Sequence, residues 1–228
     1  MGYKVTLEGF GRTDWKEFLR SEGSLLLKPD VPSLNVRAYL FETPSLSIGR
    51  LFRIPDDLEE PLKNTSLPVW RRMTGGGIAF HGKDLVFSLS LPTKHVYGNV
   101  SYFPRTFANA VQQVLRESGF NPVWGRIPGR KSPFCLLSES ERDLFIDGWK
   151  VFSFAGIVRR DITLFHFQLC SLPVGEWSSS ILSGGAKVPD FYGKLASIVG
   201  QEEFVRRVVT LFENILFCNV SLTQAGGG

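Results

Sequence analysis

The residues best suited to chemistry lie in one short stretch, 71–82, which reads Arg-Arg-Met-Thr-Gly-Gly-Gly-Ile-Ala-Phe-His-Gly. Three consecutive glycines leave the backbone bare, so its N–H groups can approach a ligand closely. A hairpin turn normally needs one glycine, and the surplus favours a loop that contacts a ligand. Arg71 and Arg72 add positive charge and forked donors for a carboxylate, a phosphate or an acyl carbonyl. The alternative is a flexible hairpin whose arginines lie in water.

Two further candidates are Cys135, which lies inside a long connection rich in proline, glycine and positive charge, and Lys150, two residues past Gly148 of a hairpin turn. A free thiol has a pKa of ~8.5 and is mostly protonated at neutral pH, and a nearby ammonium would raise its thiolate fraction. The thiolate of Cys135 could then act as a nucleophile. The alternative for Lys150 is an ordinary solvated lysine beside a turn.

These two segments resemble the signatures of the lipoate and biotin protein ligase family. In that family, paired arginines, a Ser or Thr and a glycine run precede a strand that ends in histidine, and the segment wraps an apolar acyl tail. The resemblance implies that Lys150 contacts the acyl carboxylate or carbonyl. It also implies substrate-binding roles for a larger set of residues: Arg71, Arg72, Thr74, Gly75, Gly76, Gly77, His81, Ala155 and His166. For His81 and His166, a hydrogen-bonded structural role remains an equal alternative.

Cys135 helps to distinguish the branches of the family. In the cysteine-dependent octanoyltransferases, a nucleophilic cysteine precedes the lysine hairpin at a similar distance, so the resemblance favours Cys135 and Lys150 as the catalytic pair. It also implies an α+β fold with a mixed, mainly antiparallel sheet flanked by helices. We expect one ligase-like domain over residues 1–228, without the accessory C-terminal domain of many ligases. Residues 225–228 are expected to be disordered.

Three functions stay open. The first is transfer of an octanoyl or lipoyl group to a lysine of a lipoyl-domain protein through a Cys135 thioester, without a cofactor and with an acyl carrier protein as the other partner. The second is an ATP-dependent lipoate ligase that forms an acyl-adenylate and uses ATP and Mg. The third is a non-catalytic acyl- or partner-binding relative. Phe152 and Phe154 depart from the Gly-Ser-Ala usual after the lysine, and they could shorten or block an acyl tunnel.

Composition limits the class of protein. The 228 residues carry a net charge of +4, with lysines and arginines scattered along the chain, which favours an acidic protein partner over nucleic acid. The three cysteines, Cys135, Cys170 and Cys218, include no Cys-x-x-Cys pair, which indicates a reducing, cytoplasmic setting. Cys170 and Cys218 have apolar neighbours and are expected to be buried. The sequence predicts no membrane segment and no metal site, and we expect a monomer.

Hydrophobic periodicity predicts the elements that must position these residues. Asp14 is expected to cap the first helix, and Asp147-Gly148 to form a hairpin turn. The connections 55–66 and 121–141 are expected to be long loops. Helices are predicted at 14–27, 105–117 and 202–217, and strands at 36–42, 45–49, 68–73, 78–81, 85–91, 143–146, 149–158 and 162–169.

Overall fold

The computed structural model describes residues 4–26, 34–125, 132–138, 142–169, 177 and 191–225. Cys170, the side chain of Cys218, most of the basic connection and the tail beyond residue 225 lie outside the described part, so the predictions made for them stay predictions.

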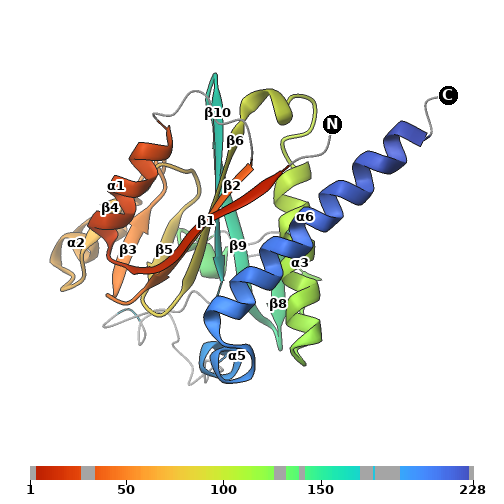
Figure 1. The fold of residues 1–228 in the computed structure, drawn as a ribbon. Helices are drawn as coiled ribbons and strands as arrows, with labels where there is room; N and C mark the ends of the chain where they lie inside the picture. Colours follow the sequence, from red (N-terminus) through yellow and green to blue (C-terminus); the bar gives the residue numbers. More distant parts are fainter. Residues whose placement is uncertain are drawn as a thin grey trace.

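Seven strands form the main sheet, in the order β1-β2-β6-β10-β9-β8-β7 (Figure 1). β1 runs parallel to β2, and the other neighbours are antiparallel. The strands are β1 (Val5–Thr13), β2 (Leu34–Phe41), β6 (Leu85–Pro92), β7 (Val123–Gly125), β8 (Asp143–Ile146), β9 (Trp149–Val158) and β10 (Ile162–Leu169). A smaller sheet has the order β4 (Val69–Arg71), β3 (Ser45–Ile48) and β5 (Ile78–His81). The expected mixed, mainly antiparallel architecture is confirmed.

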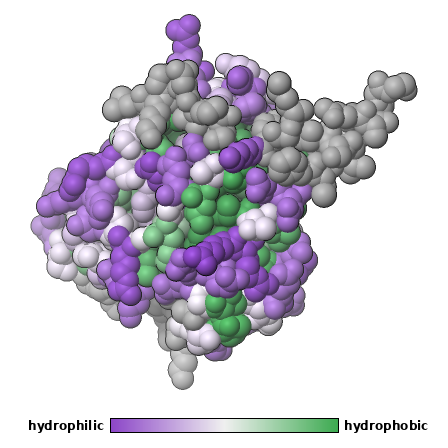
Figure 2. All heavy atoms as spheres, in the orientation of Figure 1, coloured by the Kyte–Doolittle hydropathy of each residue, from purple (hydrophilic) through white to green (hydrophobic). Residues whose placement is uncertain are grey.

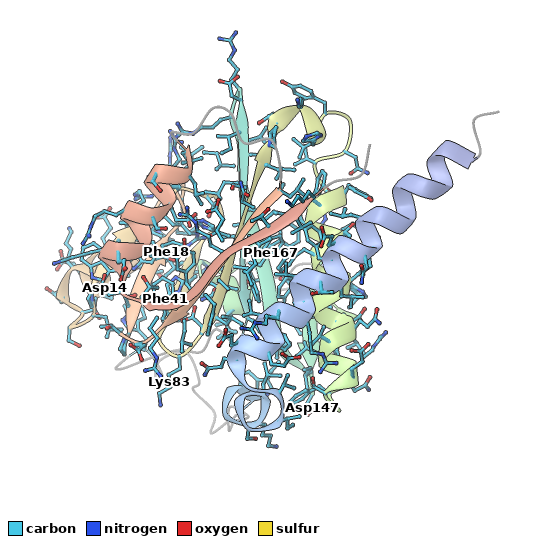
Figure 3. All side chains as sticks on the ribbon, in the orientation of Figure 1. Asp14, Phe18, Phe41, Lys83, Asp147 and Phe167 are labelled. Atoms are coloured by element: carbon cyan, nitrogen blue, oxygen red, sulfur yellow. The ribbon has the colours of Figure 1, made fainter. Side chains whose placement is uncertain are left out.

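Helices cover the main sheet on both faces (Figure 1). α3 (Tyr102–Glu117) and α6 (Gln201–Ala225) bury the larger core on one face, with α5 (Phe191–Val199) beside α6. Phe167 of β10 stacks on Phe107 of α3 with ring centroids 4.2 Å apart. On the other face lie α1 (Trp15–Leu26), the small sheet and α2 (Asp56–Asn64). There Phe18 of α1 packs against Phe41 of β2, 5.2 Å between centroids (Figure 3).

Local signals account for several element boundaries. Asp14 caps α1, because its Oδ1 accepts hydrogen bonds from the backbone N–H groups of Lys16 and Glu17 at 2.7 and 2.9 Å. Asp147 and Gly148 both have positive φ, 50° and 78°, as the two-residue turn between β8 and β9 requires (Figure 3). Both predictions are confirmed.

Several regions differ from the sequence prediction. α5 was not predicted, and the connection 121–141, expected to be a loop, contains β7 and a 3₁₀ turn at Cys135–Leu137. The connection 55–66, expected to be a loop, contains α2, a polar helix with Pro61 inside it and Leu62 as its one buried residue among those described. Its apolar face is too narrow to give a clear helical period. β1 was not predicted, because Gly9 and Gly11 interrupt its alternation, and it lies at the edge of the sheet with a bulge between Leu7 and Gly9.

The face seen in Figure 2 has an apolar area near its centre, where β1 passes between α1 and α6, surrounded mainly by hydrophilic residues. In the described part of the chain, every helix is too short or too polar to cross a membrane.

Candidate active site

A cavity of about 180 Å³ lies between the small sheet and the β9–β10 part of the main sheet. An apolar cavity of roughly 150 Å³ can bind benzene, so this one has room for about six to eight carbon atoms. Its apolar lining includes Phe18, Trp70, Ala79, Val86, Phe154 and Ala155. Its polar lining includes Arg72, His81, Cys135, Lys150, His166 and Gln168.

Most of the sequence-predicted site residues meet at this cavity, although they come from distant parts of the chain. Arg72, Gly76, Gly77, His81, Cys135, Lys150, Ala155 and His166 line it. Arg71, Thr74 and Gly75 do not. The side chain of Arg71 is instead bound by its own protein, because Nη1 donates to the carbonyl oxygens of Gly49 and Phe52 at 2.8 and 3.1 Å. That side chain therefore fastens the loop after β3 to β4.

The glycine run allows other parts of the protein to approach the loop closely. Gly76 has a φ of 87°, and a methyl group placed on it would lie 2.7 Å from Arg72 Nη2 and 3.6 Å from Cys135 Sγ. A methyl group on Gly77 would collide with the carbonyl oxygen of Pro133 at 2.2 Å. The bare backbone thus makes room for the guanidinium of Arg72 and for the turn that carries Cys135.

Arg72 is 7% exposed, and all five of its N–H bonds have acceptors. Nε and Nη2 donate to the carbonyl oxygen of Gly75 at 3.1 and 2.7 Å, and Nη1 donates to Ser47 O and Oγ at 3.1 and 3.0 Å. The remaining N–H of Nη2 points to Cys135 Sγ, 3.8 Å away. Burial lowers the pKa of Arg72, and the charge of Cys135 opposes that effect.

No carboxylate among the described residues lies within ion-pair distance of Arg72. A buried cation needs compensating charge or dipoles, and the carbonyl oxygens of Ser47 and Gly75 supply only dipoles. A thiolate at Cys135 or an anionic substrate would supply the charge. The half-buried Cys135 begins the 3₁₀ turn η2 (Cys135–Leu137), so its backbone is fixed beside the guanidinium.

Lys150 is buried below the same turn. Its Nζ lies 2.6 Å from Asp143 Oδ2 and donates to the carbonyl oxygens of Cys135 and Ser138 at 2.8 and 2.7 Å. An ammonium has three N–H bonds, and these three protein acceptors account for all of them. Lys150 therefore fastens both ends of η2 to β8 and β9, while the cation next to the sulfur of Cys135 is Arg72.

Each histidine of the cavity is bonded at both ring nitrogens. His81 Nε2 lies 2.8 Å from Ser47 Oγ, and its Nδ1 lies 2.8 Å from Asp84 Oδ2. His166 Nδ1 lies 3.0 Å from Thr74 Oγ1, and its Nε2 lies 2.6 Å from Glu22 Oε2. Both histidines thus connect the wall of the cavity to a fully buried carboxylate.

Glu22 is the centre of the hydrogen-bond network that includes His166. Ser88 Oγ and Tyr39 OH donate to its Oε1 at 2.8 and 3.2 Å. Burial first, and then the charge of Glu22, raises the pKa of Tyr39 to about 12, so the phenol remains a donor at neutral pH. The network ties α1, β2, β6 and β10 to the glycine loop through His166 and Thr74.

The two phenylalanines expected to obstruct a tunnel have different positions. Phe152 is 1% exposed in the main core, with its ring stacked 5.9 Å from Phe167, and it does not line the cavity. Phe154 does line the cavity, and it packs against the same core at its edge. One of the two residues therefore limits the space available to a ligand.

Sequence reasoning missed three residues that organise the site, Glu22, Ser47 and Asp84. A signal existed for Glu22, because it falls with Phe18 and Leu25 on the buried face of α1. An acidic residue on an apolar helical face needs an internal partner. Ser47 carries no such signal, because its contact with His81 depends on the pairing of β3 with β5. Asp84 lies three residues after His81, and the turn between β5 and β6 brings the two side chains together. Among the described residues, no group of three or more His, Cys, Asp or Glu side chains is arranged to hold a metal ion.

The mixed sheet, the helices on both of its faces and the cavity between the two sheets agree with the α+β fold that the sequence predicted. Residues 36–214 match the lipoyl protein ligase A/B catalytic domain, and the chain belongs to that family.

Curated relatives narrow the comparison within the family. The chain is 28% identical over 144 residues to octanoyltransferase LipM of Exiguobacterium sp., which covers 58% of this chain and 52% of that protein. It is 23% identical over 206 residues to octanoyltransferase LipM of Oceanobacillus iheyensis, covering 82% of this chain and 73% of that protein. The match to the first of these relatives spans about half of its length.

Solved structures share the fold. A lipoate-protein ligase A bound with ATP superposes with a TM-score of 0.63 at 20% identity, covering 95% of this chain and 86% of that one. A bi-partite lipoate protein ligase of Thermoplasma acidophilum, described with its E2 lipoyl domain, gives a TM-score of 0.61 at 21% identity, covering 95% and 84%. The recognition of the ligase fold from the sequence is confirmed.

Proposed function

We propose that this protein transfers an octanoyl or lipoyl group from a thioester donor to a lysine of a lipoyl-domain protein, through an acyl thioester on Cys135. The observation that carries the proposal is the contact between Cys135 Sγ and the buried guanidinium of Arg72, 3.8 Å apart. A guanidinium beside the sulfur can bind the negative charge that the sulfur carries when it attacks or leaves as a thiolate. The similarity to proteins named octanoyltransferase supports the same reaction class.

The first step exchanges one thioester for another. The thiolate of Cys135 attacks the carbonyl carbon of the donor thioester and forms a new carbon–sulfur bond. The donor carbon–sulfur bond breaks, and the donor thiol leaves after taking up a proton from solvent. The acyl chain then lies in the cavity, where Phe18, Trp70 and Phe154 supply apolar surface.

The second step forms an amide. The neutral amine of an acceptor lysine attacks the acyl carbon, a carbon–nitrogen bond forms, and the bond to Cys135 breaks. The proton of the amine passes to solvent, and the sulfur leaves as the thiolate that faces Arg72. Because an amide is more stable than a thioester, this step proceeds without ATP.

Lys150 and the glycine loop hold the reacting group in place. Lys150 acts through the backbone of Cys135, whose carbonyl oxygen it binds at 2.8 Å. Because η2 is held at both of its ends, Sγ keeps its position against Gly76 and Gly77 while the acyl group is exchanged. A lipoyl domain is the proposed acceptor, a partner that also occurs with the Thermoplasma ligase, and an acyl carrier protein is the proposed donor.

The test uses intact-protein mass spectrometry. Incubation with octanoyl acyl carrier protein is expected to add one octanoyl group to Cys135, and addition of a lipoyl domain is expected to remove it as the domain is modified. Cys135→Ala is the negative control, because it lacks the sulfur that would carry the octanoyl group.

Two other outcomes would refute the proposal and identify the competing functions. Modification of the lipoyl domain from free lipoate and ATP, but not from the carrier protein, would indicate a ligase. Binding of an acyl chain or of the lipoyl domain that survives loss of both Cys135 and Lys150, without turnover from either donor, would indicate a non-catalytic relative.

A further inference from the structure

A chain of hydrogen bonds leads from a buried carboxylate to the guanidinium beside Cys135. Asp84 Oδ2 lies 2.8 Å from His81 Nδ1, His81 Nε2 lies 2.8 Å from Ser47 Oγ, and Arg72 Nη1 lies 3.0 Å from the same Oγ. Ser47 and Asp84 are 0% exposed and His81 is 6% exposed. The reaction proposed above does not itself require these three residues, so their arrangement needs its own explanation.

The donor chemistry of Arg72 sets the direction of the first hydrogen bond, and a neutral His81 sets the others. A guanidinium only donates, so Ser47 Oγ accepts from Arg72 and has its one hydrogen left for His81 Nε2. In a neutral His81 that accepts this hydrogen at Nε2, Nδ1 carries the hydrogen that Asp84 accepts. Further donors hold Asp84 itself: Gly82 N at 2.7 Å and Gln168 Nε2 at 2.7 Å.

This order of hydroxyl, imidazole and carboxylate is also that of a serine nucleophile with its base. Ser47 differs in two respects. Its oxygen is fully buried, and it already accepts a hydrogen bond from Arg72. The hydrogen bonds therefore end at the guanidinium, which is the group that faces the thiol.

The effect on Arg72 is geometric. The guanidinium is planar and rigid, so fixing Nη1 on Ser47 and Nε on Gly75 also fixes the direction of the Nη2 hydrogen that points to Cys135 Sγ. When the Ser47 hydroxyl donates a hydrogen bond to His81, its oxygen becomes a better acceptor for the hydrogen bond from Arg72.

We propose that Ser47, His81 and Asp84 are positioning residues that hold the guanidinium of Arg72 against Cys135 and so set the reactivity of the thiol. The inference deepens the proposed function and rests on it for its biological meaning. The quantity that it predicts is the rate at which Cys135 reacts with an electrophile.

The experiment measures alkylation of Cys135 by iodoacetamide at neutral pH, followed by peptide mapping that separates Cys135 from the other two cysteines. Ser47→Ala and His81→Gln are each expected to slow alkylation about tenfold, the effect of losing one hydrogen bond to a charged group. Ser47→Thr keeps the hydroxyl and is expected to restore most of the rate. Ser90→Ala is the matched control, because Ser90 is buried in β6, its hydroxyl has no hydrogen-bond partner among the described residues, and it does not line the cavity.

Wild-type alkylation rates in folded Ser47→Ala and His81→Gln would overturn the inference, as would an equal loss in Ser90→Ala. A second measurement covers variants that do not fold: nitrogen NMR of the wild-type protein is expected to place the His81 hydrogen on Nδ1, and a neutral His81 with its hydrogen on Nε2 contradicts the proposed direction. Alkylation needs no acyl donor, so failure of this inference is distinguishable from failure of the octanoyl adduct, which tests the proposed function alone.

Discussion

Arg72 and Cys135, 63 residues apart in sequence, meet at 3.8 Å because the glycine loop and η2 have no side chain between them. Gly76 lies beside both groups, because a methyl group on it would be 2.7 Å from Arg72 Nη2 and 3.6 Å from Cys135 Sγ, and its positive φ of 87° suits glycine. The glycine run therefore serves the contact between a cation and a thiol, and this dependence gives the first prediction.

Arg72→Lys is expected to slow both alkylation of Cys135 and octanoyl transfer by about tenfold to a hundredfold. A lysine has three donors on a flexible stem, so it cannot satisfy Ser47, Gly75 and the sulfur together. Arg12→Lys, on the exposed edge strand β1, is the matched control. Equal rates for both variants would show that the guanidinium does not act on the thiol.

The buried pair of Lys150 and Asp143 gives the second prediction, which concerns stability. Lys150→Met removes the cation that lies 2.6 Å from the 4% exposed Asp143, and Asp143→Asn removes the carboxylate beside a 5% exposed ammonium that two carbonyl oxygens also bind. Each single change is expected to cost about 3–5 kcal/mol of the free energy of unfolding. The double variant is expected to lose less than the sum, and urea denaturation of all four proteins measures the difference. Additive losses would mean that the two charges are not coupled.

Much of the fold could be predicted because its signals are local. Strands β5 and β10 have the predicted bounds, and α1 begins immediately after its Asp14 cap, because alternation and capping depend on a few neighbouring residues. β1 and α2 could not be predicted, since glycines and polar residues hide their periods and tertiary packing decides their structure.

In the candidate site, the sequence identifies some of the residues but not the partners that define their roles. Cys135, Arg72 and the two histidines are conspicuous as residue types, and the structure brings them to one cavity. The roles of Ser47 and Lys150 depend on which groups surround them. A serine in a short strand and a lysine after a turn have the same local sequence whether they face solvent or a buried carboxylate, so only the three-dimensional structure reveals their partners.

The third prediction concerns the length of the acyl chain. Phe154 lines the cavity, so Phe154→Ala is expected to shift the preference of octanoyl transfer toward chains longer by about two to four carbons, since each buried methylene contributes ~0.8 kcal/mol. Competition between acyl donors of different length measures the ratio of their kcat/KM values. Phe152→Ala is the comparison, because this residue lies in the core and its loss is expected to reduce stability by about 3–5 kcal/mol without changing the preference. An unchanged preference in Phe154→Ala would mean that the chain does not extend toward this residue.

The fourth prediction concerns pH and the cap of α1. The backbone N–H of Glu17, with a further contribution from that of Lys16, holds the pKa of Asp14 below its ordinary value of 3.8. The stabilisation from a depressed carboxyl pKa is present above the ordinary value and is lost as the pH falls through the folded-state value. Asp14→Asn keeps a capping oxygen that cannot titrate. The melting temperature of the wild-type protein relative to Asp14→Asn is therefore expected to fall below pH ~4, where the wild-type cap becomes protonated. A constant difference between the two melting temperatures down to pH ~2, well below the usual range of an aspartate, would show that the charge of Asp14 does not stabilise the helix.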